Sequence, residues 1–184
     1  MDAKTFSIPV RENLVLRFIQ PEEAEALFAL VDRNRAYLRE RLNWVDKETE
    51  PRNSLETIQK RIEAATVPKR LEFGIYLDSQ LVGSMGFNEI SMRNKFGEIG
   101  YWLTEELQGQ SIMTDCVRAL VTYGFAEVGL NRIEIRCSPT NLKSEAIPKK
   151  LGFTYEGTAR GRYFLYDHFE DSKVYSMLAS EWKN

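Results

Sequence analysis

Cysteine and histidine are scarce in this sequence of 184 residues. It contains two cysteines, Cys116 and Cys137, and a single histidine, His168. Two scattered cysteines cannot build a disulfide framework or a thiolate metal site, and one histidine cannot complete a metal site alone. We therefore expect no metal, and we expect both cysteines to be reduced and to act as small apolar fillers.

The sequence also lacks a dominant charge and any long hydrophobic run. Its 25 Lys and Arg residues nearly balance 27 Asp and Glu residues, for a formal net charge of -2. This balance removes the general electrostatic argument for binding nucleic acid or an anionic membrane. No stretch approaches the roughly 20 apolar residues that span a bilayer, and no apolar run follows a basic start. We expect a cytoplasmic protein whose partners are neither nucleic acids nor membranes.

Hydrophobic residues make up 43% of the chain, and no repeat, low-complexity tract or linker divides it. We therefore expect a single domain over residues 1–184. Asn53 is expected to cap a helix, with Glu56 three positions later completing a capping box. Apolar periodicity predicts, in chain order, a strand (14–19), two helices (from Pro21 to Val31 with a continuation over 37–42, and one after Asn53), three strands (73–77, 81–90 and 96–103), a helix (111–129), a strand (132–138), a helix (142–151) and two strands within 154–182.

One part of this order places a ligand site. The strand over 96–103, the helix over 111–129 and the strand over 132–138 form a strand–helix–strand unit, so the two strands should be parallel neighbours. Ligands of open sheets favour the carboxyl ends of strands where connections diverge. The polar turn from Gln108 to Thr114 lies there, and its unpaired amides at the positive end of a helix dipole favour a phosphate group. The alternative is a solvated helix start that binds nothing.

One motif follows the first strand of this unit, and another follows its second strand. Gln108-Gly109-Gln110-Ser111-Ile112-Met113 precedes a helix, and Asn141…Ser144…Leu151-Gly152-Phe153 follows the next strand. Together with the element order, they resemble the GNAT family of acetyl-CoA-dependent N-acetyltransferases over almost the whole chain. Ile99-Gly100-Tyr101-Trp102-Leu103, Val117-Arg118-Ala119-Leu120 and Leu151-Gly152-Phe153-Thr154-Tyr155-Glu156-Gly157 are most similar to the branch that acetylates the N-termini of ribosomal proteins.

The resemblance implies both a fold and a reaction. The fold is α+β (α/β/α-like): a mixed, mostly antiparallel seven-stranded sheet, splayed in the middle and flanked by about four helices. The reaction is direct transfer of the acetyl group of acetyl-CoA to a primary amine in a ternary complex. The implied acceptor is the N-terminal α-amine of a protein or peptide, such as a ribosomal protein.

The resemblance also assigns coenzyme contacts. In the family, amides of the turn hold the pyrophosphate, and here Ser111 and Met113 replace the usual small residues. Pantetheine is expected in the splay along the strand edge, where the amide of Leu103 or Trp102 stabilises the oxyanion. Asn141 is expected to contact pantetheine or simply to cap its helix. The implied coenzyme-binding residues are Trp102, Leu103, Gln108, Gly109, Gln110, Ser111, Ile112, Met113, Thr114, Asn141 and Ser144.

A group must also protonate the departing thiolate. Many family members use a tyrosine for this, at the position that Ile147 or Pro148 occupies here. Ser144, one turn earlier, is the nearest substitute and resembles the serine of the ribosomal-protein branch. Pro148 lacks an N–H, so the Ser144 carbonyl loses its helical partner and is expected to bond water or ligand. The alternative is an ordinary serine on a kinked surface helix.

The amine must lose a proton before it attacks, and Glu98 is the candidate general base. Its neighbours Phe96, Ile99 and Tyr101 are expected to desolvate the carboxylate and raise its pKa. Glu134 and Glu156 compete for the same role. An α-amine with a pKa of about 8 asks less of a base than a lysine amine near 10.4, which favours α-amine acceptors.

Two other functions remain open. Acetylation of a small amine, such as a polyamine or aminoglycoside, would need an acidic pocket, which Glu22-Glu23-Glu25 and Asp46…Glu48…Glu50 could supply. A non-catalytic acyl-CoA-binding sensor is suggested by Ser111, Met113 and the missing phenol. The aromatic tail (Tyr163, Phe164, Tyr166 and Phe169) is expected to line an acceptor groove or a contact in a homodimer or larger homo-oligomer, and Trp44 to wall the acceptor pocket or pack in the core.

Overall fold

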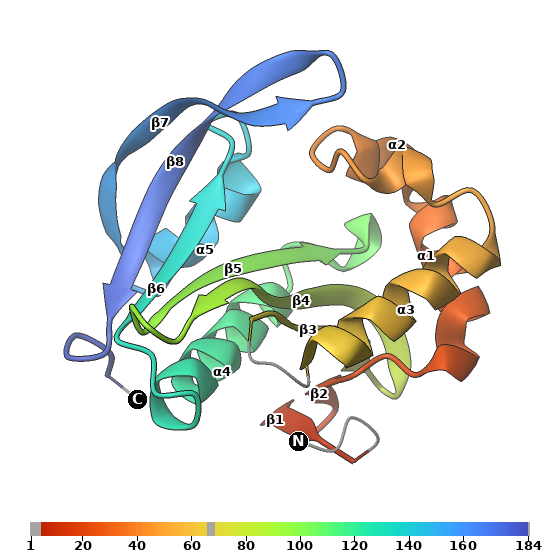
Figure 1. Cartoon of the computed structure of the whole chain (residues 1–184), viewed down its shortest axis with the longest axis horizontal. Helices are drawn as coiled ribbons and strands as arrows, with labels where there is room; N and C mark the ends of the chain where they lie inside the picture. The colour runs from red at the N-terminus through yellow and green to blue at the C-terminus, as the bar shows by residue number, and fades with distance from the viewer. Residues whose placement is uncertain (1–4, 66–68, 184) are drawn as a thin grey trace.

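The computed structural model of the chain describes residues 5–65 and 69–183, although side chains are described only to residue 63 in the first segment. These residues form one eight-stranded sheet in the order β1-β2-β3-β4-β5-β6-β8-β7, with helices on both faces (Figure 1). The strands are β1 (Ser7–Arg11), β2 (Leu14–Arg17), β3 (Leu71–Leu77), β4 (Gln80–Ser91), β5 (Phe96–Leu103), β6 (Arg132–Cys137), β7 (Thr154–Leu165) and β8 (His168–Leu178). The α-helices are α1 (Ala24–Arg33), α2 (Arg35–Arg39), α3 (Pro51–Ala65), α4 (Ile112–Ala126) and α5 (Leu142–Lys150), and the 3-10 helices are η1 (Pro21–Glu23), η2 (Val45–Lys47) and η3 (Glu105–Leu107).

The sheet confirms the expected mixed topology with one parallel pair. β5 and β6 are parallel, and each other neighbouring pair among the described strands is antiparallel. The sequence prediction of seven strands missed β1. This strand has only five residues, carries Pro9 and buries a single residue, Ile8, so it lacks the alternation by which a strand is recognised.

Two hydrophobic clusters hold the helices to the sheet. The larger one joins β3, β4 and β5 to the buried stripe of α4, which includes Val117, Leu120 and Val121. The smaller one joins α1 and α3 through residues such as Leu27 and Ile58. Figure 1 shows α4 and the α1–α3 group on opposite sides of the central strands. None of the helices in the described ranges is long and apolar enough to cross a membrane.

The two parallel strands part in the middle of the sheet. β5 pairs with β6 from Phe96 to Ile99, whereas its remaining residues, Gly100 to Leu103, pair only with β4. β6 continues to Cys137 along β8 instead. This is the expected splay, and it opens at the carboxyl ends of both strands.

The helix expected after the Asn53 cap begins three residues earlier than predicted, at Pro51. Proline suits the first turn of a helix because it needs no amide partner there. Asn53 Oδ1 instead accepts hydrogen bonds from the amides of Thr49 and Glu50, each at 3.1 Å. Glu56 does not complete the predicted capping box, and it pairs with Arg52 at 3.3 Å.

A buried carboxylate attaches α5 to the sheet. Glu145 is 4% exposed and accepts contacts from Lys149 on its own helix at 2.8 Å and from Lys173 and Tyr175 of β8 at 2.9 and 2.5 Å. These hydrogen bonds, with that of Lys149 the largest, lower the pKa of Glu145 to about 2. The ionised carboxylate therefore fixes the position of the helix that carries Ser144.

We predict that Glu145→Gln destabilises the protein near neutral pH but not in acid. Because the folded-state pKa is depressed, the contribution of this group is present above its ordinary value of 4.5 and is lost as the pH falls toward 2. The Tm difference between wild type and variant should therefore shrink between pH 5 and 2 in thermal melts. The control Glu12→Gln, at an exposed turn residue, should leave Tm unchanged; a deficit that persists at low pH would contradict the prediction.

Candidate active site

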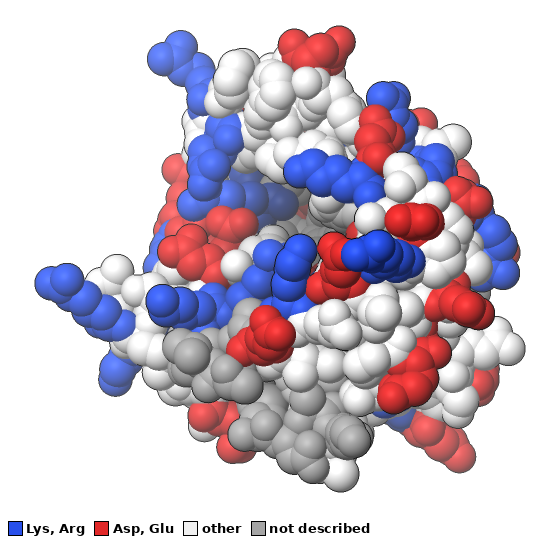
Figure 2. Space-filling view, turned by 45° about the vertical axis from the view of Figure 1, so that its right-hand side comes forward, with Lys and Arg blue, Asp and Glu red and all other residues white. Residues whose placement is uncertain are grey.

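A cavity of about 1280 Å³ opens where β5 and β6 part. It is walled by α2, α3, the start of α4, α5 and the β7–β8 hairpin. Figure 2 shows its mouth as a hollow with both basic and acidic side chains around it. Every expected coenzyme-binding residue except Gln110 borders this cavity, as does Glu98. The tertiary structure thus gathers the candidate residues from β5, α4 and α5 in one place.

The turn before α4 exposes a row of amides. Gly109 and Ser111 both have positive φ, at 77° and 62°, and α4 begins directly after Ser111. In the described part of the chain, the amides from Gly109 to Thr114 have no backbone acceptor. Met113, the second departure from the family pattern, is buried in the core, so its bulk does not fill the turn. Gln110 is exposed on the outside of the turn.

Two lysines of α5 add positive charge beside this turn. Lys143 Nζ donates to Gln108 Oε1 at 2.8 Å, and Lys150 Nζ lies 3.3 Å from Ser111 Oγ. The sequence analysis did not single them out, although a spacing of seven residues places them on one helix face. The amides and both ammonium groups make the turn a strong candidate for binding phosphate groups.

The free edge of β5 presents alternate amides to the splay. The Thr104 amide donates to the Val82 carbonyl of the β4 side at 3.0 Å, so residue 104 directs its hydrogen-bonding groups toward β4. Antiparallel pairing alternates, and with the observed register the amide of Trp102 also faces β4, whereas those of Tyr101 and Leu103 face the splay. Of the two residues proposed from the sequence as oxyanion donors, this geometry favours Leu103.

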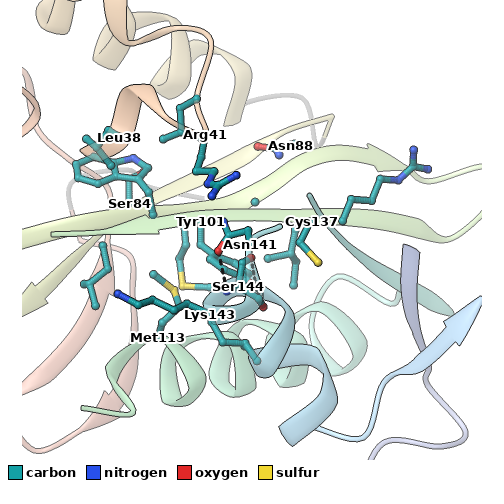
Figure 3. Close-up of a pocket in the computed structure, with 18 of the residues that line it drawn as sticks. Leu38, Arg41, Ser84, Asn88, Tyr101, Met113, Cys137, Asn141, Lys143 and Ser144 are labelled. Carbon is teal, nitrogen blue, oxygen red and sulfur yellow. Dashed lines mark hydrogen bonds between the residues drawn. The ribbon is translucent and has the colours of Figure 1, made fainter. Parts of the chain in front are cut away.

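Ser144 lies on α5 beside a phenol that the sequence analysis missed. Asn141 Oδ1 accepts from the Ser144 amide at 3.1 Å and so caps the helix. The Ser144 carbonyl, freed by Pro148, was expected to bond water or ligand. It instead accepts a hydrogen bond from the Tyr101 hydroxyl at 3.1 Å, and Ser144 Oγ donates to the same phenolic oxygen at 3.3 Å. Figure 3 shows these side chains together at the end of α5.

Glu98 is the cavity carboxylate with a raised pKa. Burial is the main cause, and it outweighs the opposing charges of Arg136 and Arg162. Arg136 Nε lies 3.1 Å from Glu98 Oε2. The direction of the shift agrees with the expectation, but Arg136, which the sequence analysis did not pair with Glu98, limits its size.

The two competing carboxylates have structural partners instead. Glu134 is buried, with one oxygen 2.5 Å from Arg132 and the other 2.9 Å from Arg136. Glu156 lies 2.6 Å from Arg132, whose hydrogen bond lowers the pKa of Glu156 to about 2. Neither borders the cavity, so Glu98 is the better placed of the three.

The aromatic tail divides between the cavity and the surface. Tyr163 borders the cavity and its hydroxyl accepts from the Asn43 amide at 3.1 Å, while Tyr166 donates to the Leu42 carbonyl at 2.8 Å. Phe164 and Phe169 contact each other with centroids 5.0 Å apart and remain 48% and 69% exposed. Tyr163 and Tyr166 therefore join the tip of the β7–β8 hairpin to the loop after α2, beside the candidate acceptor groove.

Two further side chains expected to pack in the core also reach the cavity. Trp44 borders it and lies 6.2 Å from Trp102 between ring centroids, in agreement with the wall expected from the resemblance. Cys137 borders it as well, whereas Cys116 is fully buried. Burial raises the pKa of Cys137 to about 11, which keeps this thiol protonated near neutral pH.

A family model described as an acetyltransferase (GNAT) domain matches residues 13–154 of the chain. The chain belongs to the GNAT acetyltransferase family. This membership confirms the class of enzyme and the fold that the resemblance implied.

Two named relatives are similar in sequence to this GNAT acetyltransferase over nearly their whole length. It is 33% identical to the putative ribosomal N-acetyltransferase YdaF of Bacillus subtilis, over 97% of this chain and 98% of the relative. It is 31% identical to the ribosomal-protein-serine acetyltransferase of Escherichia coli, over 95% of this chain and 97% of the relative.

Two solved structures with bound coenzyme share the fold of this GNAT acetyltransferase. RimL, a ribosomal L7/L12 alpha-N-protein acetyltransferase in complex with coenzyme A, matches with a TM-score of 0.89 and 31% identity, over 94% of this chain and 98% of that one. The microcin C7 self immunity acetyltransferase MccE, in complex with acetyl-CoA and AMP, matches with a TM-score of 0.88 and 26% identity, over 92% and 94%.

We predict that Ser111→Gly raises the Tm of this GNAT acetyltransferase and that Ser111→Val lowers it. Ser111 has a φ of 62°, where a Cβ costs about 1–2 kcal/mol and a β-branched residue more. For a chain of this size that corresponds to a Tm change of about 2–4 °C per kcal/mol in thermal melts. Ser180→Gly, at an exposed serine without positive φ, is the control and should not stabilise. A Ser111→Gly protein less stable than wild type would contradict the strain.

Proposed function

We propose that this enzyme transfers the acetyl group of acetyl-CoA to the N-terminal α-amine of a protein, and that a ribosomal protein is the acceptor. The observation that carries the proposal is one continuous cavity that joins the amide-rich turn before α4 to the outward-facing amides of β5 and to Glu98. The similarity to two ribosomal acetyltransferases over nearly their whole length supports the acceptor class. Such an acceptor also favours the cytoplasm as the place of reaction.

The residues present fit acetyl-CoA. The amides from Gly109 to Thr114, with Lys143 and Lys150, would hold the pyrophosphate. The unpaired edge of β5 would bind the pantetheine amides as an added strand does, with Asn141 beside it. When bound, the coenzyme supplies an acetyl group activated as a thioester.

The reaction then requires three contributions from the protein. Glu98 accepts one proton as the amine nitrogen forms its bond to the acetyl carbon. The Leu103 amide stabilises the negative charge on the carbonyl oxygen. As the carbon–sulfur bond breaks, Ser144 gives one proton to the thiolate, and solvent returns that proton to Ser144 and removes the one on Glu98. The acetyl transfer is therefore balanced in one ternary complex, with no covalent enzyme intermediate.

The charges of the cavity argue against a polycationic acceptor. Of the acids named as a polycation pocket, Glu23 pairs with Arg17 at 2.8 Å and Asp46 pairs with Arg39 at 2.8 Å. Glu48 borders the cavity, but it is buried with its oxygens bonded to two hydroxyls of α3. Away from the turn before α4, the cavity is bordered by the basic residues Arg41, Lys47, Lys60, Arg61, Arg70, Arg136 and Arg162 and by the carboxylates Glu48, Glu72, Glu98, Glu105, Glu170 and Asp171. Glu72 is paired with Arg61 and Arg70, and Glu98 with Arg136. A polyamine or aminoglycoside would meet these cations.

The sensor alternative also loses part of its support. It rested on Ser111, on Met113 and on the missing phenol. The amides around Ser111 have no backbone acceptor in the described part of the chain, Met113 packs into the larger core cluster while it borders the cavity, and Tyr101 places a phenol beside Ser144 from β5. Turnover is therefore the function that the arrangement favours.

We predict that thiol release from acetyl-CoA is fastest with short peptides that carry a free N-terminal Ser, Ala or Met. Parallel reactions with spermidine, an aminoglycoside and peptides blocked at the N-terminus but carrying a lysine should be at least about tenfold slower, because basic side chains outnumber carboxylates around the cavity and the lysine amine is harder to deprotonate. Mass spectrometry locates the acetyl group. Inert peptides beside a polyamine that turns over would overturn the acceptor assignment, and coenzyme binding without any release would favour the sensor.

We predict that Glu98→Gln lowers kcat/KM by about 10²-fold and removes one step of the pH profile. Protonation of an α-amine alone gives a slope of one below pH 8. In wild type the slope should increase to two below the pKa of Glu98, which lies above 4.5 because of burial, since both groups must then be deprotonated. Glu89→Gln, opposite Glu98 on β4, removes a charge that contributes to the raised pKa of Glu98, so it should retain the steeper limb and move it slightly to lower pH. Identical profiles for wild type and Glu98→Gln would exclude Glu98 as the base.

A further inference from the structure

We propose that Tyr101 is the positioning residue of Ser144, and that Pro148 makes this role available. The inference deepens the proposed function, because it rests on Ser144 as the donor of a proton to the thiolate. It concerns three residues from two elements: Tyr101 of β5, and Ser144 and Pro148 of α5. The first two border the candidate cavity.

Pro148 interrupts the hydrogen bonding of α5. In an α-helix the carbonyl of residue i accepts from the amide of residue i+4. Pro148 stands four residues after Ser144 and has no amide hydrogen, so the Ser144 carbonyl has no partner within α5. A buried carbonyl left unsatisfied is unfavourable, and the Tyr101 hydroxyl supplies the missing donor at 3.1 Å.

This hydrogen bond fixes the role of the phenol. A tyrosine hydroxyl has one hydrogen and it also accepts. Because the Tyr101 hydrogen is directed to the Ser144 carbonyl, its oxygen can only accept from Ser144 Oγ, which lies 3.3 Å away. Burial raises the pKa of Tyr101 above its ordinary value of 10, so the phenol keeps its hydrogen near neutral pH. Both contacts hold the Ser144 side chain in one place.

A thiolate formed in the cavity would compete for the same serine hydrogen. A charged acceptor makes a stronger hydrogen bond than a neutral phenol, so the thiolate draws the Ser144 hydrogen away from Tyr101. This rotation of the Ser144 O–H bond moves only the hydrogen and leaves Ser144 Oγ in place. The phenol therefore keeps the serine oriented before the carbon–sulfur bond breaks. As that bond breaks, the serine hydrogen leaves the phenolic oxygen and turns to the thiolate. Tyr101 acts through Ser144 and transfers no proton itself.

The test is a double-mutant cycle in kcat between Tyr101→Phe and Ser144→Ala. Tyr101→Phe should lower kcat about tenfold while the KM for acetyl-CoA stays within twofold. In the Ser144→Ala background the same change should have no further effect, because the residue that Tyr101 positions is gone. The matched control is Tyr155→Phe, at an exposed tyrosine outside the cavity, which should leave kcat and KM unchanged.

A second measurement separates positioning from folding. Tyr101→Phe leaves the Ser144 carbonyl unsatisfied and should lower Tm by about 2–6 °C. Pro148→Ala supplies the helical amide, so it should raise Tm more in the Tyr101→Phe background than in the protein with Tyr101. It should not restore kcat, since the Ser144 hydroxyl still lacks its phenol.

Each outcome has one meaning. The positioning role would be overturned if Tyr101→Phe lowered kcat equally in wild type and in the Ser144→Ala background. It would also be overturned if adding Pro148→Ala to Tyr101→Phe restored kcat together with Tm. A slow Ser144→Ala enzyme with a fully active Tyr101→Phe enzyme would overturn it too, and would leave the proposed chemistry intact. A fully active Ser144→Ala enzyme would remove the assigned acid itself, and with it this inference, while peptide acetylation would still stand.

Discussion

The parting of β5 from β6 after Ile99 is the constraint on which the site depends. Each strand is held on its other edge, β5 by β4 and β6 by β8, so the two cannot close the gap by sliding together. Buried backbone amides need partners, and the outward-facing amides of Tyr101 and Leu103 find none on β6. An extended, amide-bearing arm such as the pantetheine of acetyl-CoA would satisfy them, in line with the proposed coenzyme site at this edge.

Strain and missing hydrogen bonds gather around the same opening. Ser111 holds a left-handed conformation at the start of α4, and Pro148 removes a hydrogen bond from α5. Backbone irregularities of this kind persist when the surroundings hold them in place. Here the larger core cluster fixes α4, and the buried Glu145 fixes α5 against β8. The energetic disadvantage of the irregular positions is thereby offset by the packing of the regular elements around them.

The charged side chains near Glu98 share hydrogen-bond partners. Glu134 holds Arg132 and Arg136 at once, so Arg136 is shared between a buried structural carboxylate and Glu98. Burial raises the pKa of Glu98 although Arg136 lies beside it, a combination that suits a weak base for an α-amine. The remaining basic side chains around the cavity favour an acceptor that does not carry several positive charges.

The order of elements, the parallel pair, the polar turn before α4 and the family could all be predicted from the sequence, because they depend on local periodicity, turn chemistry and motifs contiguous in the chain. Strand β1 was missed because it buries too little to show a pattern, and the start of α3 was placed three residues late. Three features could be read only from the folded chain: Glu98 is the candidate base that borders the cavity, Leu103 rather than Trp102 directs its amide into the splay, and Tyr101 contacts Ser144. These depend on strand register and on partners 43 residues apart in the chain, which no local pattern of residues encodes.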